Sequence, residues 1–99
     1  MIFSFSETVN IRTIGELKEE ITTNISNVDF IVLDLDKCSD VDLSVLQLVE
    51  SIRIYAASAG KAIKLSSPAN AAVAATLTRA GFTERMSRED RLFWLHKED

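Results

Sequence analysis

Hydrophobic residues change their spacing along the chain in a way that separates strands from helices. They alternate with polar residues near the N-terminus and in two later segments, which is typical of strands, and recur every three or four positions elsewhere, which is typical of amphipathic helices. The pattern predicts strands over 2–9, 28–36, 62–66 and 91–96, and helices over 13–25, 43–59 and from Ser67 to Gly81. The predicted order is β-α-β-α-β-α-β, an α/β layer fold.

The segment from Val28 to Asp36 is the clearest strand. Ile31 and Leu33 lie on one face, and Phe30 and Val32 on the other. Apolar residues on both faces predict a central strand covered on both sides, as in a parallel sheet. The following helix and the strand 62–66 complete a βαβ crossover, which makes the two strands parallel.

Three helix boundaries carry recognisable signals. Thr13 and Glu16 match a capping box at the start of the first helix. Gly60 stands where the second helix needs a left-handed residue. Ser67 as N-cap, with Pro68 at the first helical position, predicts the start of the third helix.

Composition narrows the function classes. The 99 residues are 46% hydrophobic and 26% charged, which fits one globular domain over 1–99. A net charge of −4 argues against a nucleic-acid binder. No apolar run approaches the roughly 20 residues of a membrane helix, and Met1–Ser6 does not resemble a signal peptide. We therefore expect a cytoplasmic protein without membrane insertion.

The strand 28–36 leads into an acidic loop at the edge where open α/β sheets bind ligands. Two interpretations remain open for its four aspartates. They could hold a hard divalent cation, or they could serve local structure, with Asp42 as the N-cap of the next helix. The acidic residues are Asp34, Asp36, Asp40 and Asp42.

Few other residues offer chemistry. Ser44 lies in the first turn of a helix, where a phosphate would meet free amides, although Asp42 would repel it. Cys38 is expected to be a small buried residue rather than a reactive thiol. Phe93 and Trp94 are expected to alternate on the last strand. One histidine, His96, and no phosphate-binding glycine loop argue against an enzyme and against a cofactor.

The run from Ile31 to Glu50, IVLDLDKCSDVDLSVLQLVE, resembles the signature of the STAS domain, the fold of bacterial anti-sigma factor antagonists and of sulfate-transporter tails. Asp42-Leu43-Ser44-Val45-Leu46 takes the place of the family's Asp-Ser-(Ser/Thr/Ala)-Gly-Leu. The Ser66-Ser67-Pro68 turn and the Thr13–Lys18 helix start also fit. The resemblance implies a mixed sheet of about four strands, with helices mainly on one side.

The chain departs from the family pattern at the regulated residue. The resemblance implies a serine directly after the aspartate, which a kinase-type anti-sigma factor phosphorylates to break the complex. Here that position is Leu43, which cannot accept a phosphate, and the following glycine is Val45. Ser44 matches the second, usually unmodified position, while Asp42 is retained.

The leading hypothesis is a non-catalytic protein-interaction module in bacterial signalling or partner switching, without the usual phosphoacceptor. The expected partner is a kinase-like anti-sigma factor or a chemotaxis protein. Alternatives are a subunit of a chemotaxis or transporter-associated complex, and a switch phosphorylated at Ser44. The sequence leaves the oligomeric state open. The expected contact residues are Ser39, Asp40, Asp42, Leu43, Ser44 and Gln47.

Overall fold

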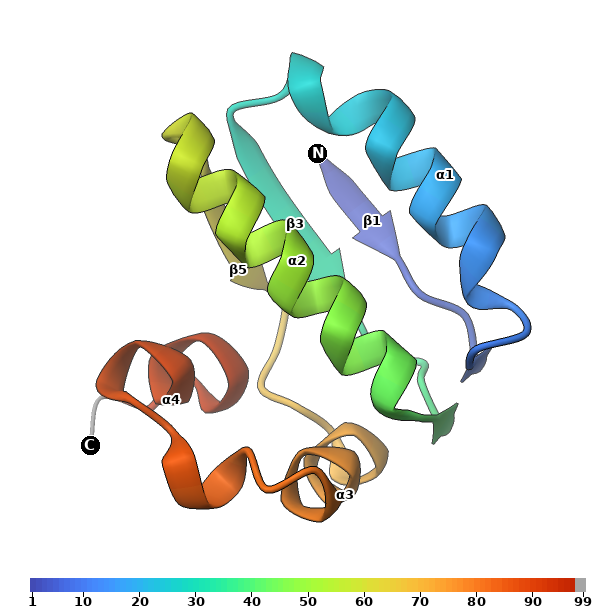
Figure 1. Ribbon diagram of the computed structural model, residues 1–99, viewed down its shortest axis with the longest axis vertical. Helices are drawn as coiled ribbons and strands as arrows, with labels where there is room; N and C mark the ends of the chain where they lie inside the picture. The colour runs from blue at the N-terminus through green and yellow to red at the C-terminus, as the bar shows by residue number, and fades with distance from the viewer. Residues whose placement is uncertain (98–99) are drawn as a thin grey trace.

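The computed structural model describes residues 1–97 and contains a parallel sheet with helices on one face (Figure 1). Strands β1 (Ile2–Ser4), β3 (Phe30–Asp34) and β5 (Ala62–Leu65) form this sheet in the order β1-β3-β5. All of its pairs are parallel, with Phe3 opposite Leu33 and Leu33 opposite Leu65. The predicted βαβ crossover over 28–66 is therefore confirmed.

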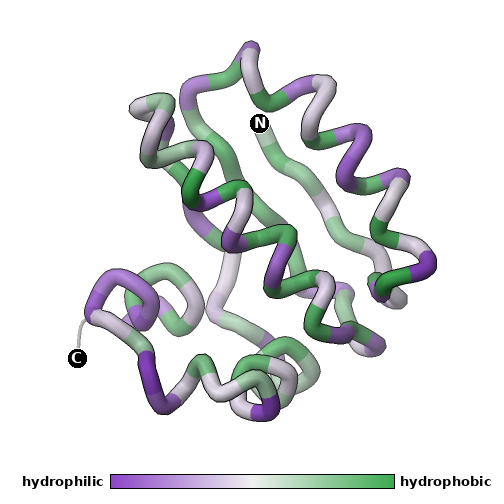
Figure 2. Tube along the Cα trace, viewed as in Figure 1, coloured by the Kyte–Doolittle hydropathy of each residue, from purple (hydrophilic) through white to green (hydrophobic). Residues whose placement is uncertain are grey.

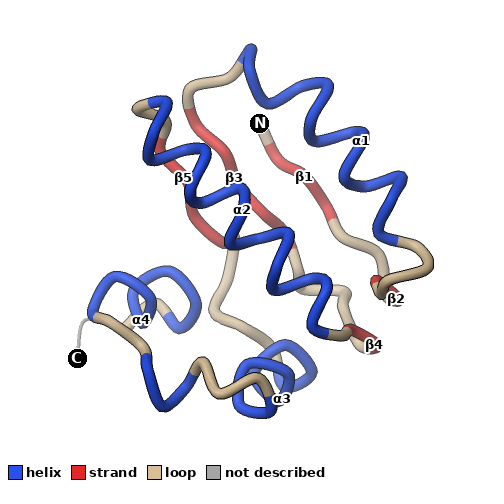
Figure 3. The backbone as a smooth tube through the Cα atoms, in the orientation of Figure 1, coloured by secondary structure: helices blue, strands red, loops and turns tan. Residues whose placement is uncertain are grey.

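A second, smaller sheet extends the first. Strands β2 (Thr8–Val9) and β4 (Asp40–Val41) pair in parallel beyond the ends of β1 and β3 (Figure 3). The predicted strand 2–9 is thus two short strands separated by a bend. The expected four-stranded mixed sheet is wrong: the described residues form one sheet of three strands and one of two, all parallel.

Helices α1 (Ile14–Asn24) and α2 (Leu43–Ala59) cover one face of the larger sheet (Figure 1). The side chains beneath them include Phe3, Ile31 and Leu33, none of which is exposed. Figure 2 shows how hydrophobic residues dominate β1 and β3 while polar residues interrupt both helices. Helices on one side are what the family resemblance implied.

The other face of the sheet is largely open, so the prediction that the strand 28–36 is covered on both sides is wrong. Phe30 is 47% exposed and Ile2 64% exposed on this face. The Lys64 ammonium lies 5.8 Å from the centre of the Phe30 ring and provides part of its cover. Alternating apolar residues therefore predicted the strand correctly but not what lies over each face, because an aromatic ring also tolerates a half-exposed site.

Two further helices follow β5: α3 (Ala71–Arg79) and α4 (Arg88–Leu95), with 3₁₀ turns η1 (Ile25–Asn27) and η2 (Thr83–Arg85) elsewhere in the chain. The third helix begins three residues later than predicted, at Ala71 rather than Pro68. Asn70 is its N-cap, and its side chain accepts from the Val73 amide at 2.9 Å. Ser67 instead donates its hydroxyl to the Asp36 carboxylate at 3.2 Å.

The predicted final strand over 91–96 is also wrong, because this segment lies in α4. Ser87 and Asp90 form a complete capping box at the start of that helix. Both Phe93 and Trp94 are buried, whereas neighbours on a strand would point to opposite faces. Arg53 of α2 binds the Asp90 carboxylate at 2.9 Å and so fastens α4 to α2.

The first two helices have the ends that were expected, with one difference. Gly60 ends α2 with a φ of 71°, the left-handed conformation that glycine adopts without strain. At the start of α1, the Thr13 side chain makes no cap hydrogen bond and accepts instead from the Asn10 amide at 3.1 Å. The predicted capping box with Glu16 is therefore absent, although the helix begins within one residue of its expected start.

Candidate partner-binding site

The start of α2 is organised around Asp42, as its position before the helix predicted. Its Oδ1 accepts from the Ser44 amide at 3.0 Å and also from the Ser44 hydroxyl. Its Oδ2 accepts a hydrogen bond from the Ile11 amide at 3.1 Å. One carboxylate therefore caps α2 and holds the loop before α1 against it.

Two shallow hollows flank this end of α2, and an exposed apolar side chain lines each of them. Leu43, 48% exposed, lines a hollow towards α3, and Ile11, 71% exposed, lines one towards α1. The residues of the first hollow are Asp42, Leu43, Thr76, Arg79 and Ala80. Those of the second are Ile11, Ile14, Lys18, Ser44, Gln47, Leu48 and Ser51.

The structure brings together four of the six expected contact residues. Asp42, Leu43 and Ser44 are consecutive, and Gln47 follows Leu43 by four residues, so both side chains lie on one helix face. Ser39 directly precedes β4 and Asp40 is its first residue, and their amides donate to the Glu7 carbonyl at 2.9 and 3.0 Å, respectively. Their side chains are exposed, but neither lines the two hollows.

Two carboxylates of the acidic loop accept hydrogen bonds from within the chain. Asp34 accepts from the Asp36 amide at 3.0 Å, while Asp36 accepts from the Ser67 hydroxyl. Over residues 1–97, no three side chains of histidine, cysteine, aspartate or glutamate are grouped so that they could hold a metal ion. The geometry gives the metal interpretation no support.

Cys38 lies in the same loop and is buried, as expected. Burial, together with the negative charges of Asp34 and Asp36, raises the pKa of its thiol to about 11. The thiol is therefore protonated at neutral pH, and a protonated thiol is a poor nucleophile.

Asn70 is a structural residue of this region that the sequence interpretation missed. Its Nδ2 donates to the carbonyl of Cys38 at 2.7 Å and to that of Leu35 at 3.3 Å, while its Oδ1 caps α3. One side chain thus joins the loop after β3 to the start of α3. An asparagine immediately before the alanine-rich run is a good N-cap signal, but the serine and proline just before it gave the stronger pattern.

Comparison with known families identifies this architecture. The STAS domain family model matches residues 1–97, so the chain belongs to the STAS domain family. Neither curated proteins nor solved structures give a match. STAS domains are generally non-enzymatic modules that mediate protein–protein interactions. Within residues 1–97, no helix is long and apolar enough to cross a membrane.

The role of Asp42 predicts a pH-dependent contribution to stability. The hydrogen bond from the Ser44 hydroxyl has the largest effect and lowers the pKa of the Asp42 carboxyl. Burial, the next largest effect, raises this pKa, but the amides of Ile11 and Ser44 lower it further, so the net direction is downward. A lowered pKa stabilises the fold above the unfolded-state value of about 3.9, and this contribution is lost as pH falls through the folded-state value. We expect Asp42→Ala to cost about 1 kcal/mol at pH 7 and clearly less at pH 3.

Urea denaturation of the wild type and Asp42→Ala at both pH values measures this difference. Asp40→Ala is the matched control, because Asp40 is exposed and its side chain makes no hydrogen bond within the described part of the chain. A cost of Asp42→Ala that is the same at pH 3 and pH 7 would show that the carboxylate charge does not stabilise the fold.

Proposed function

We propose that this STAS domain, spanning residues 1–99, is a non-catalytic module of bacterial signalling or partner switching that binds a protein partner through the start of α2. The observation that carries the proposal is Leu43. It is half exposed at the first position of a helix whose neighbouring polar groups are satisfied within the chain. An apolar side chain held on such a rigid base is suited to fill a partner's pocket.

The same position supports binding without phosphorylation control. Leu43 carries no hydroxyl, and the hydroxyl of Ser44 is bound to the Asp42 carboxylate. A phosphate on Ser44 would break that bond and place its charge beside Asp42, which disfavours modification. We therefore propose a constitutive contact, with Asp42 and Gln47 as polar neighbours of Leu43, and Ser39 and Asp40 at the margin of the surface.

The test replaces Leu43 with glutamate and measures binding to candidate kinase-like and chemotaxis proteins by pull-down and calorimetry. Burial of a leucine contributes about 1.5–3 kcal/mol, so Leu43→Glu should weaken a genuine complex at least about tenfold. Leu92→Glu is the matched control, because Leu92 is 50% exposed on α4, outside the proposed surface. Equal affinities for the wild type and Leu43→Glu would refute the assignment.

Asp42→Lys is a weaker test of the same surface, because Asp42 also caps α2 and holds the loop at Ile11. Loss of binding in that variant could result either from a lost contact with the partner or from destabilisation of the fold. The alternative switch at Ser44 is distinguished by mass spectrometry after incubation with the kinase partner and ATP. If Ser44 is phosphorylated and the phosphorylated chain no longer binds, the proposal of a constitutive contact is wrong and the protein is a switch controlled at Ser44.

A further inference from the structure

The outer edge of β1 has unpaired backbone groups. The Met1 carbonyl and the Phe5 amide bond to β3, at Val32 and Asp34. Since hydrogen-bonding directions alternate along a strand, the amides and carbonyls of Ile2 and Ser4 point away from β3. β1 lies at the end of the sheet order, so no described strand pairs with these groups. Such an edge can accept an additional strand.

A groove runs beside this edge, between β1 and α1, and its volume is about 190 Å³. Its floor includes Ser4 and Ser6, and its helix side is one stripe of α1 with positions three or four apart. That stripe contains Glu16 and Glu20, and no basic residue lines the groove. The lining residues are Ser4, Ser6, Val9, Thr13, Glu16, Leu17 and Glu20.

We propose that this groove binds an extended segment of another protein that pairs with β1 and alternates basic with apolar residues. Side chains opposite Phe3 would lie on the helix side of the sheet, where Glu16 and Glu20 complement lysine or arginine. Side chains opposite Ile2 would lie on the other face, beside the 64% exposed Ile2. The alternation of the segment therefore follows from the two faces of the sheet.

The charge of the groove argues against a second copy of this chain as the occupant. Pairing of β1 with β1 of another copy would bring a second α1 against the first. The same two glutamates on each helix would then repel one another. The proposed surface is separate from that at Leu43, because the groove and the hollow at Leu43 share no lining residue.

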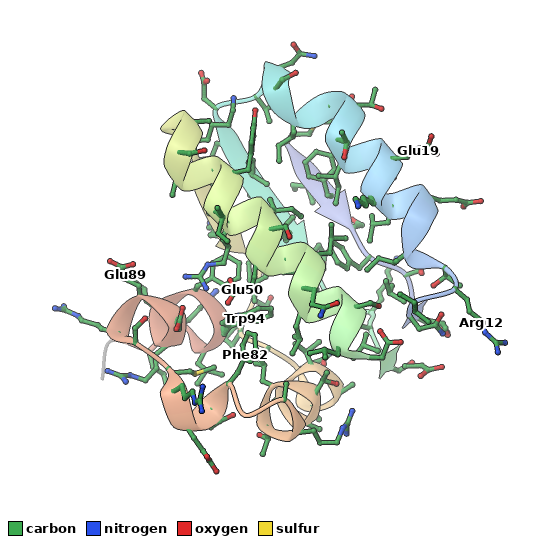
Figure 4. The ribbon with its side chains drawn as sticks, viewed as in Figure 1. Arg12, Glu19, Glu50, Phe82, Glu89 and Trp94 are labelled. Carbon is green, nitrogen blue, oxygen red and sulfur yellow. The ribbon has the colours of Figure 1, made fainter. Side chains whose placement is uncertain are left out.

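The test uses a fluorescent nine-residue peptide that alternates lysine with valine, titrated with the full chain and followed by anisotropy. We expect saturable binding that weakens at least about tenfold in a Glu16→Lys/Glu20→Lys double variant. Glu19→Lys is the matched control, because Glu19 does not line the groove and Figure 4 shows it on the side of α1 facing away from β1. It should change the affinity less than about twofold.

Strand pairing itself is tested by removing backbone donors. Ser4→Pro removes an outward amide while leaving the bonds to β3, and a peptide N-methylated on alternate residues removes the matching donors of the ligand. Both should abolish saturable binding, with circular dichroism confirming that the variant is folded. Equal binding of the N-methylated peptide, equal loss in Glu19→Lys, or dimerisation of the free chain through β1 in sedimentation would each overturn the proposal.

Discussion

Replacement of Asn70 by alanine is expected to lower the free energy of unfolding by about 2–4 kcal/mol, the larger part of it from lost contacts to the loop after β3. Loss of the α3 N-cap accounts for about 1 kcal/mol. The remainder comes from the backbone carbonyls of Leu35, Asp36 and Cys38, which all accept from Nδ2 of Asn70. Cys38 is buried, so water does not readily replace the bond to its carbonyl.

Two substitutions at this position separate the cap from the loop contacts. Asn70→Asp keeps an oxygen for the Val73 amide but has no amide group to donate to the three carbonyls. We expect it to cost more than the cap alone, because its carboxylate also faces carbonyl oxygens. Asn70→Ser should retain the cap and lose only the loop contacts, so its cost should fall below that of alanine by about 1 kcal/mol.

Urea denaturation followed by circular dichroism measures these costs. Asn24→Ala is the control, because Asn24 also donates its side-chain amide to a backbone carbonyl, that of Glu20 at 2.7 Å, but within a single exposed helix end. We expect less than about 1 kcal/mol there. An Asn70→Ala cost no greater than that of Asn24→Ala would mean that the loop is held by its packing rather than by Asn70.

The sequence predicted those parts of the fold in which one pattern extends over many residues. Helix α2 has a regular apolar stripe and Gly60 at its end, and the crossover from β3 to β5 followed from it. The cover on the second face of β3 could not be predicted in this way. Phe30 and Ile31 are both apolar, yet one is 47% exposed and the other fully buried, because only one face has helices above it.

The sequence predicted the candidate site only where its contacts join residues that are close together in the chain. Asp42 was expected as an N-cap because it directly precedes the helix. The Ser44 amide that donates to its carboxylate is only two residues further along the chain. The bond from the Ile11 amide to the same carboxylate spans 31 residues. No spacing in the sequence indicates such a contact, since it depends on how β2 and β4 pair.

The apolar run near the C-terminus does not indicate its secondary structure without the residues that precede it. Leu92, Phe93, Trp94 and Leu95 form a short apolar run, which periodicity alone does not assign to a strand or a helix. Ser87 and Asp90 indicate a helix, because a serine followed three residues later by an acidic side chain forms a capping box at a helix start. The position of the helix is then fixed by Arg53, whose guanidinium lies 4.4 Å from the centre of the Phe93 ring.

This packing gives a second prediction with a large expected effect. Trp94 is fully buried, on the side of α4 that faces α2 (Figure 4), and its ring meets that of Phe93 edge-on with centroids 5.2 Å apart. Its carbonyl accepts from the Ala69 amide at 2.7 Å, which joins α4 to the turn before α3. We expect Trp94→Ala to cost about 3–5 kcal/mol, as loss of a large core side chain usually does.

Trp94→Phe should cost much less, about 1–2 kcal/mol. Among the described residues, the indole Nε1 is buried without a hydrogen-bond partner, so the native tryptophan already carries an unsatisfied donor. Relative to tryptophan, phenylalanine leaves a small void, which costs stability, and removes that unsatisfied donor, which offsets part of the cost. Because Trp94 is the only tryptophan, unfolding must be followed by circular dichroism. Both substitutions remove the indole nitrogen, so the difference between them reports the side-chain volume that phenylalanine retains. Equal costs for phenylalanine and alanine would contradict the prediction that lost volume dominates.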